Sequence, residues 1–378
     1  LPAPPPSLLP SSVSILDLLG IPQPSAIAQQ WDAPGSPPAA HIGITATGTL
    51  TVDLLDDGPH VLVAGAPGPG RRGLLRTMVA SLAAGSAPDD VGFVLVGQGF
   101  ESVAGLPHTM ARIVDLRAHP ITRLLRSLHA ELRHREGAVR NSGATGRGVT
   151  TDATFPRLVM VIDDWEMLVG GVPEFASMIL DLARRGPDLG VHLIVATRHP
   201  ADVVDGRLAS LFGVRLALRQ QEEGDSIAMI GNRDAALLPD HVPGRGLARV
   251  GTSERIEFQS ANGDGHDDVD VDLRPFVVGR DLVPMEQRLE RSPAAAPADP
   301  DDSGTDIAAL VTALRDAADR RGRAAARRPV AEPLPDRLPM RAFFDEHPGD
   351  GVPFGLADLP DEQRTSPTWW SPVGPIGA

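Results

Sequence analysis

Short apolar runs alternate with stretches of helical periodicity along the middle of the chain. The apolar runs, rich in Val, Leu and Ile, lie at residues 60–64, 91–96, 158–162, 191–196 and 214–218. The helical stretches lie at residues 73–84, 121–139 and 173–185. Strands that are apolar throughout and separated by helices indicate a mostly parallel sheet covered on both faces. The pattern therefore predicts an α/β fold.

The segments before this pattern predict two further strands. Residues 42–45 and 49–54 each form a short run of strand type. Ahead of them, residues 1–40 are a Pro-rich lead-in with one short amphipathic helix that ends at Gly20. We expect the core domain to span residues 41–262.

Composition changes after this domain. Residues 263–303 form an acidic and Pro/Ala-rich linker. Within it, the alternating Asp and Val of residues 264–272 predict an exposed strand; a calcium loop is the alternative, although the EF-hand spacing and its closing Glu are absent.

A helix is predicted in residues 304–330, running from Thr305 to Arg328. Its apolar stripe predicts that it packs back on the domain; its Arg-rich end leaves a basic docking helix as the alternative. The stripe consists of Ile307, Leu310, Val311 and Leu314.

The last segment, residues 331–378, resembles the start of the domain. A proline-rich lead precedes residues 352–356 (Val-Pro-Phe-Gly-Leu), which match residues 41–44 (His-Ile-Gly-Ile). This echo predicts the start of a second, truncated copy of the same module.

Charge and composition limit the possible functions. The net charge is −14, which argues against unaided nucleic-acid binding, because phosphate neutralisation supplies most of that affinity. The chain has no Cys, so disulfides and thiolate metal sites are excluded. It also has no Lys, so every cationic side chain apart from His is Arg. No apolar run reaches the roughly 20 residues that span a bilayer.

A glycine-rich loop follows the run at residues 60–64 and precedes a helix. It resembles the P-loop pattern Gly-x-x-x-x-Gly-Lys-Ser/Thr, in which backbone N–H groups cradle phosphates. Arg replaces the phosphate-binding Lys and the Mg²⁺-ligating Ser/Thr, and two prolines remove backbone donors. The candidate nucleotide-binding residues are Gly65, Ala66, Pro67, Gly68, Pro69, Gly70, Arg71 and Arg72.

An acidic pair ends the apolar run at residues 158–162. This is the Walker B pattern, in which the first carboxylate holds Mg²⁺ and the second, normally Glu, polarises the attacking water. Asp163 fits the first role and would ligate the metal if Mg²⁺ binds, whereas Asp164 is one methylene shorter than Glu. Both are candidate catalytic residues, and the alternative is that they are ordinary helix-start acids.

Three further arginines lie on apolar strands or directly after them. Arg198 stands where a γ-phosphate sensor is expected, at the end of a central strand. Arg215 and Arg219 lie on an apolar strand, and one of them is predicted to act as an arginine finger on a neighbouring subunit's nucleotide; the alternative is a strand-edge Arg in a surface salt bridge.

In the order and spacing of these motifs, the chain resembles the FtsK/SpoIIIE family, which includes the EccC-type ATPases of type VII secretion. Further matches are residues 57–65, 182–197 (Leu-Ala-Arg-Arg-Gly-Pro-Asp-Leu-Gly-Val-His-Leu-Ile-Val-Ala-Thr) and 243–246. The resemblance implies a RecA-like P-loop fold with additional strands, ATP and Mg²⁺ as cofactors, and neighbouring ATPase modules as partners. It also implies a DNA or secreted-protein substrate, a cytoplasmic location, and membrane attachment only through segments outside this chain.

The departures from the family pattern fall at the nucleotide site. Besides Arg71, Arg72, Asp164 and Arg198, they include residues 97–101, Gly-Gln-Gly-Phe-Glu, where the family has Asp-x-Lys-Gly-Gly. The interpretation is a degenerate ATPase module with a regulatory or structural role in a multi-domain motor, or one that binds nucleotide weakly. An active ATP-driven translocase is the alternative.

Overall fold

The structure is a computed structural model, and it describes most of the chain outside residues 264–304. The described residues are 9–20, 24–32, 38–142, 155–204, 208–251, 255–263, 305–322, 327–346 and 351–371. The predicted acidic strand, its calcium-loop alternative and most of the predicted linker lie outside the described residues.

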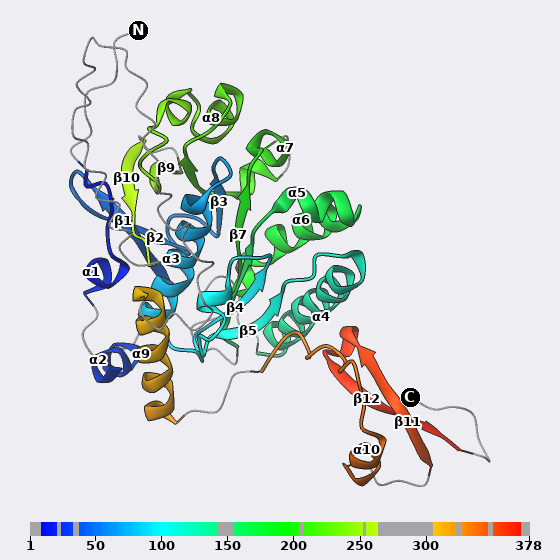
Figure 1. Ribbon diagram of the computed structural model, residues 1–378. Coiled ribbons are helices and arrows are strands. Elements are labelled where there is room, and N and C mark those ends of the chain that lie inside the picture. Colours follow the sequence, from blue (N-terminus) through cyan, green and yellow to red (C-terminus); the bar gives the residue numbers. More distant parts are fainter. Residues whose placement is uncertain are drawn as a thin grey trace, which may run out of the picture.

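A ten-stranded sheet forms the centre of the molecule (Figure 1). Six adjacent strands are parallel, in the spatial order β5 (Thr109–Ile113), β4 (Val91–Val96), β6 (Arg157–Ile162), β7 (Val191–Thr197), β3 (His60–Ala64) and β8 (Val214–Leu218). Four antiparallel strands extend the sheet beyond β8, in the order β9 (Arg245–Val250), β10 (Ile256–Ser260), β1 (Ala39–Thr45) and β2 (Gly48–Asp53). The predicted α/β fold with a mostly parallel sheet is confirmed.

Helices cover both faces of this sheet, because successive residues of its strands point to opposite sides. In β3, Val61 and Val63 join one core and Leu62 and Ala64 the other. The first core lies beneath α1 (Ile15–Leu19), α2 (Pro24–Trp31), α3 (Pro69–Gly85) and α9 (Asp306–Arg321). The second lies beneath α4 (Ala118–Ser142), α5 (Trp165–Gly171), α6 (Phe175–Arg185), α7 (Pro200–Val204) and α8 (Glu223–Ile230).

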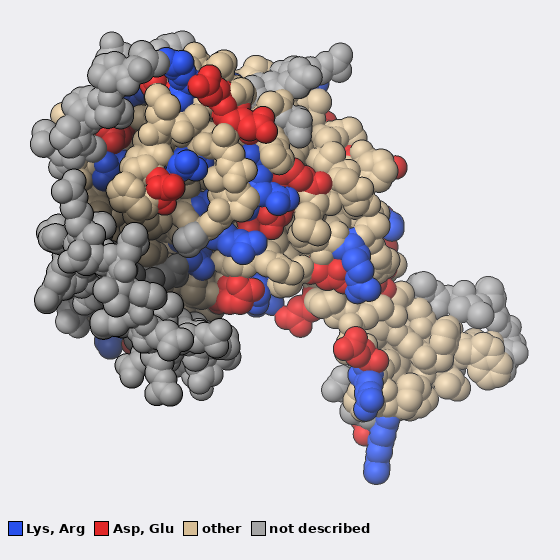
Figure 2. Space-filling view, turned by 45° about the horizontal axis from the view of Figure 1, so that its top comes forward, with Lys and Arg blue, Asp and Glu red and all other residues tan. Residues whose placement is uncertain are grey.

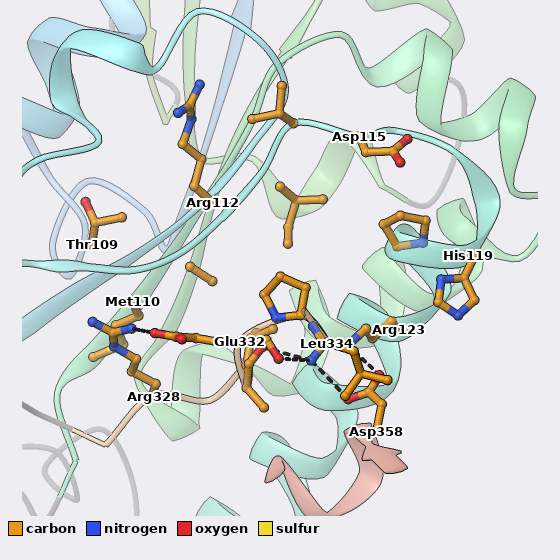
Figure 3. Close-up of a pocket in the computed structure, with 17 residues that line it drawn as sticks. Thr109, Met110, Arg112, Asp115, His119, Arg123, Arg328, Glu332, Leu334 and Asp358 are labelled. Atoms are coloured by element: carbon orange, nitrogen blue, oxygen red, sulfur yellow. Dashed lines mark hydrogen bonds and ion pairs between the residues drawn. The ribbon is translucent and has the colours of Figure 1, made fainter. Parts of the chain in front are cut away.

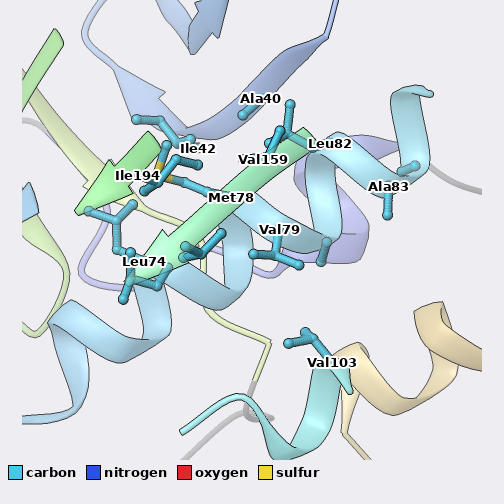
Figure 4. Close-up of a cluster of buried hydrophobic side chains, with 14 of the residues drawn as sticks. Ala40, Ile42, Leu74, Met78, Val79, Leu82, Ala83, Val103, Val159 and Ile194 are labelled. Carbon is cyan, nitrogen blue, oxygen red and sulfur yellow. The ribbon is translucent and has the colours of Figure 1, made fainter. Parts of the chain in front are cut away.

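Helix α3 is central to the first core. Figure 4 shows Met78 and Leu82 of α3 beneath Ala40 and Ile42 of β1, and all four side chains are fully buried. Full burial of one such side chain contributes roughly 1.5–3 kcal/mol, so this contact fixes the β1–β2 hairpin on the helix.

Two predicted helix boundaries were wrong. Helix α3 begins at Pro69, not at residue 73, because proline is well suited to the first helical position. Helix α9 ends at Arg321, short of Arg328, because Gly322 takes a left-handed conformation that caps it. Its apolar stripe is buried in the first core, as expected of a helix that packs on the domain.

Short 3₁₀ helices connect several of these elements. They are η1 (Glu101–Val103), η3 (Pro187–Leu189), η4 (Ala209–Leu211), η5 (Asp234–Leu237) and η6 (Pro360–Glu362).

A separate two-stranded unit projects from the body near the C-terminus (Figure 1). It consists of α10 (Met340–Glu346) and a hairpin of β11 (Val352–Leu359) and β12 (Arg364–Trp370), joined by η6. The tip of the hairpin is fixed to α4. Arg123 of α4 binds Asp358 at 2.5 Å, and the Gln363 amide donates to the Ser127 carbonyl at 3.1 Å and to the Glu131 carboxylate at 3.0 Å.

Candidate nucleotide site

The glycine-rich loop joins β3 to α3 at the carboxyl edge of the parallel strands. The Ala66 amide donates to the carbonyl of Arg219 at 2.8 Å, and the Gly65 amide to that of Thr197 at 3.4 Å. The loop is therefore held between the ends of β8 and β7. This is the strand–loop–helix context that the sequence predicts for residues 65–72.

Both loop arginines lie in the first turn of α3, which contains no acidic residue. The N-terminus of a helix carries a partial positive charge, so cations there are unfavourable unless acids lie close by. Arg71 is only 5% exposed, and a charge this deeply buried requires a partner. Here the partners come from a distant part of the chain.

Asp163 and Asp164, directly after β6, supply the compensating charge. The Arg71 Nη2 atom lies 3.2 Å from Asp163 Oδ1 and 2.9 Å from Asp164 Oδ1. The Arg72 guanidinium completes the cluster, with Nε 3.0 Å from Asp163 Oδ2 and Nη2 3.4 Å from Asp164 Oδ2. All four carboxylate oxygens thus face a guanidinium nitrogen. The hydrogen bond to Asp163 is the largest contribution that raises the pKa of Arg72.

The backbone around the acidic pair is fixed as well. The Asp163 amide donates to the Val96 carbonyl of β4 at 2.9 Å. Asp164 begins α5 with a left-handed backbone, at φ 60° and ψ 55°, which non-glycine residues adopt at a cost and Asp tolerates better than most. This conformation holds a strained residue at the site, where its carboxylate reaches both arginines.

The loop after β4 makes room for Arg72. Gly99 has φ +99°, and a Cβ atom placed there would lie 2.8 Å from Arg72 Cδ. The glycine at position 99 therefore leaves space for the Arg72 side chain, and two segments that are separate in the sequence meet at the site.

These residues do not fit Mg²⁺ bound to a nucleotide. A P-loop site needs a hydroxyl and a free carboxylate for the metal, and a compact lysine charge for the phosphates. Instead, the guanidinium groups of Arg71 and Arg72 pair with the carboxylate oxygens. Their positive charge would repel a divalent cation at this position.

Glu166, in the first turn of α5, connects the acidic pair to the end of β7. Its Oε1 accepts from the Thr197 hydroxyl at 2.6 Å and from the backbone N–H groups of Arg198 and His199 at 2.6 and 3.0 Å. Burial raises the pKa of Glu166, but these donors more than offset it and the pKa is lowered overall. Glu166 was not predicted from the sequence. The available signal was an acidic residue two positions after the acidic pair.

The other candidate arginines lie around the same edge. Arg198 lines a polar cavity of about 250 Å³ beside Ala66 and Pro67. The Arg219 Nε donates to the Leu238 carbonyl at 3.0 Å, and Arg215 Nη1 donates to the Ala228 carbonyl at 3.0 Å. The structure thus brings Arg198 and Arg219 next to the loop, while Arg215 lies on β8 and binds α8. The role of each in trans remains a prediction.

A larger cavity, of about 560 Å³, lies away from the loop (Figure 3). It is formed by β5, the start of α4 and the segment at residues 328–334. Met110 and Leu334 contribute apolar walls, and Arg123 and Asp358 pair at its rim. This cavity is thus separate from the site that the motifs identify.

The described segments contain no cluster of three or more His, Asp or Glu side chains suited to a metal ion. Among the helices of those same segments, none is both long enough and apolar enough to cross a membrane.

Comparisons with known proteins agree with this architecture. The ESX-4 secretion system protein EccC4 of Mycobacterium tuberculosis is 32% identical over 86% of this chain, and the ESX secretion system protein YukB of Bacillus subtilis is 28% identical over 95%. The alignments cover 28% and 25% of those proteins, so the chain spans about a quarter of their length.

Solved structures share the fold. The cytoplasmic domain of the type VII secretion ATPase EccC from Thermomonospora curvata matches 95% of this chain with a TM-score of 0.71 and 24% identity, over 42% of its own length. EssC ATPases 2 and 3 from Geobacillus thermodenitrificans match 97% of this chain with a TM-score of 0.65 and 16% identity, over 61% of their length. The FtsK/SpoIIIE family model matches residues 28–241, and the chain therefore belongs to the FtsK/SpoIIIE family.

Proposed function

We propose that this chain is a non-hydrolysing module of a type VII secretion-type motor, with a structural or regulatory role beside active ATPase modules. The observation that carries the proposal is the pairing of Arg71 and Arg72 with Asp163 and Asp164. In an active P-loop site these four positions hold the lysine, the hydroxyl, the metal-binding carboxylate and the glutamate that polarises water.

The free energy needed to break these ion pairs determines whether a nucleotide can enter the site. Breaking a buried ion pair by removing one partner costs roughly 3–5 kcal/mol. A nucleotide that had to displace Arg71 from Asp163 would lose an affinity factor of about 100 or more for every 3 kcal/mol. The internal pairing thus competes directly with Mg²⁺–ATP.

The active translocase remains the alternative, and a DNA substrate has little support. The chain has a net charge of −14, and Figure 2 shows Arg side chains interspersed with Asp and Glu on the face in view. A protein substrate fits this charge better, because DNA binding draws its affinity from phosphate neutralisation. One solved relative is the cytoplasmic domain of the type VII secretion ATPase EccC, and we infer a cytoplasmic location for this module as part of a membrane-associated secretion protein.

Calorimetry with ATP, ADP and Mg²⁺ tests the proposal. We expect no micromolar binding to the wild-type chain, and tighter binding after Arg71→Lys/Arg72→Ser, which restores the family's residues. Arg117→Ser is the matched control, because Arg117 is exposed and pairs only with nearby Asp115 in the described structure. Micromolar binding to the wild type, with turnover that is lost in Asp163→Asn, would support the active translocase instead.

A peptide segment is a second candidate ligand. One solved relative, ATPases 2 and 3 of Thermomonospora curvata EccC, is in complex with a signal sequence peptide. The cavity of about 560 Å³ between β5, α4 and residues 328–334 favours this role, because its apolar walls and rim charges suit a short amphipathic segment. Titration of a fluorescent secretion-signal peptide should show binding that Met110→Arg abolishes and that Met178→Arg, outside the cavity, leaves unchanged. Equal binding by both variants would remove this cavity as the site.

A further inference from the structure

Three arginines lie in a row across β8, β9 and the start of β10. Arg215 of β8 pairs directly with Arg249 of β9. Arg255 directly precedes β10, in which the next residue, Ile256, pairs with Ala248 beside Arg249. The three side chains therefore belong to neighbouring strands at the same level of the sheet, and we call them the arginine row.

The arginine row faces the side of the sheet on which α8 lies. Val214 and Ala248 are buried in the first core, and Ile256 packs against it. Because successive residues of a strand point to opposite faces, the arginine next to each of these residues points to the second face. There the arginines of β8 and β9 are half-buried, and the third is exposed.

The described contacts compensate the positive charge of the row unevenly. The Arg215 Nη1 atom donates to the neutral carbonyl of Ala228 in α8 at 3.0 Å. The Arg255 Nε atom lies 4.0 Å from Asp234 of η5, and water screens this pair because both side chains are about half exposed. The side chain of Arg249 has no hydrogen-bond or ion-pair partner among the described residues. The charge of Arg249 is therefore uncompensated in the part of the chain that the structure describes.

Arg249 also stands opposite a like charge. Like charges placed directly opposite each other on two strands are destabilising. Burial, and then the positive charge of Arg249, lower the pKa of Arg215. A bound carboxylate would replace this repulsion by attraction, because guanidinium groups donate well-oriented hydrogen bonds to planar anions. The pair is thus unfavourable by itself and favourable with an anion.

Two exposed apolar side chains belong to the elements that the row contacts. Ile227 of α8, which is 53% exposed, directly precedes the residue whose carbonyl Arg215 binds. Leu237 of η5, which is 55% exposed, lies in the same short helix as Asp234. Arginine beside large apolar side chains is typical of protein–protein interfaces. The composition of this surface therefore favours a protein as its partner.

The charge of the whole chain favours a protein partner as well. A net charge of −14 repels a polyanion such as nucleic acid, which carries one charge about every 1.7 Å of duplex. A protein segment needs only a few carboxylates to pair with the row, and its apolar side chains can cover Ile227 and Leu237.

We propose that the arginine row, together with Ile227 and Leu237, is a docking surface for a segment of a partner protein in which acidic and apolar residues are mixed. A carboxylate of that segment pairs with Arg215 and Arg249. The inference does not depend on whether the module binds nucleotide. It also gives Arg215 a role other than that of an arginine finger.

Fluorescence anisotropy with a fluorescein-labelled peptide of repeating Glu-Glu-Leu units tests the proposal. We expect the peptide to bind the wild-type chain, and Arg249→Gln to weaken binding at least about tenfold, because a charge-assisted contact is lost. Added salt should weaken binding as well. Arg140→Gln is the matched control, because Arg140 is an exposed arginine in the last turn of α4, and it should leave the affinity unchanged.

The same titration contains the results that would overturn the proposal. These are failure of the peptide to bind, equal affinity of the wild type and Arg249→Gln, and an equal loss in Arg140→Gln, which would show only general charge attraction. Tighter binding of an oligonucleotide with the same net charge would identify a nucleic-acid surface instead. Self-association of the chain that Arg249→Gln abolishes would identify a second copy as the occupant.

Urea denaturation of the same variant separates binding from folding. Arg249→Gln should leave the urea midpoint unchanged or raise it, because it removes a like charge opposite Arg215. A lower midpoint would show that Arg249 stabilises the fold, and would overturn its assignment to a partner.

Discussion

The guanidinium of Arg71 lies 3.2 Å from the carboxylate of Asp163, and this contact joins the P-loop helix to the end of β6. In active members of the fold, the corresponding lysine and carboxylate face each other across Mg²⁺ and phosphate. Here side chains of the protein itself make the connection. The two parts of the site are thus held together without a ligand, and the cluster becomes a determinant of stability.

Loss of Asp163 should destabilise the fold. We expect Asp163→Asn to lower the free energy of unfolding by about 3 kcal/mol, because it leaves the buried Arg71 with reduced compensation. Urea denaturation measures this change. The matched control is Asp115→Asn, which removes an exposed carboxylate paired with Arg117 and should change the stability little, because water screens a surface pair. Equal effects of the two substitutions would show that the cluster contributes no more than a surface pair.

A side chain at Gly99 should conflict with Arg72. We expect Gly99→Ala to cost more than about 1 kcal/mol, because it adds contact with Arg72 Cδ to the strain of a positive φ. Gly231→Ala is the control, since Gly231 has φ +80° and open space around it, so only strain applies. Urea denaturation of Gly99→Ala alone and with Arg72→Ala isolates the contact. If Arg72→Ala relieves none of the cost, the loop and Arg72 are not packed as described.

Stability should fall as the pH is lowered from about 6.5 to about 4. Burial is the main cause that lowers the pKa of His60, His108 and His192 from the ordinary histidine value of 6.5 to about 4 in the folded protein. Between these two values, the unfolded chain binds protons that the folded protein does not, so acid favours unfolding. Each histidine contributes a slope of up to about 1.4 kcal/mol per pH unit, and its full stabilisation is present above about pH 6.5.

Urea midpoints at several pH values measure this slope. His108→Gln should flatten it, because glutamine can still donate to the Ser86 carbonyl but does not titrate. His241→Gln, at an exposed position, is the control. An unchanged slope in His108→Gln would contradict the assignment to buried histidines.

Removal of the Gln363 side chain should loosen the C-terminal hairpin and leave the main sheet intact. The Gln363 amide binds three acceptors, namely the carbonyls of Ser127 and Pro329 and the carboxylate of Glu131. We expect Gln363→Ala to increase proteolytic cleavage within residues 352–370 about tenfold, the equivalent of about 1.4 kcal/mol. Glu362→Ala, which removes only a surface pair with Arg364, should change cleavage little. Similar cleavage of both variants would show that Gln363 does not anchor the tip.

The sequence predicted the parallel half of the sheet well because its strands are apolar throughout. β4, β6 and β7 are buried along nearly their whole length, which makes them visible as continuous runs. Strands β5 and β9 were not predicted. Their sequences, Thr-Met-Ala-Arg-Ile and Arg-Gly-Leu-Ala-Arg-Val, mix Arg with apolar residues, as suits a sheet edge and a partly exposed strand. Local pattern alone does not separate such strands from loops.

The candidate site was predictable as a set of positions but not as a set of contacts. Motif spacing located the loop and the acidic pair, nearly a hundred residues apart. The pairing of Arg71 with Asp163 follows only from the adjacency of β3, β7 and β6, which no spacing specifies. For the same reason Glu166 was missed, and the contact of Gly99 with Arg72 was not predicted, since each acts on a residue brought close by tertiary structure.

The order of strands in the sheet has a consequence for synthesis on the ribosome. Strand β1 emerges before the parallel strands of its sheet, yet its edge pairs with β10, where Gly43 lies opposite Ser260. Contacts so distant in sequence form late, since the intervening chain must be made first. The edge of the β1–β2 hairpin therefore stays unpaired while the six parallel strands and β9 are translated. This nascent segment needs shielding until β10 arrives, and a chain released before residue 260 would expose a strand edge prone to aggregation.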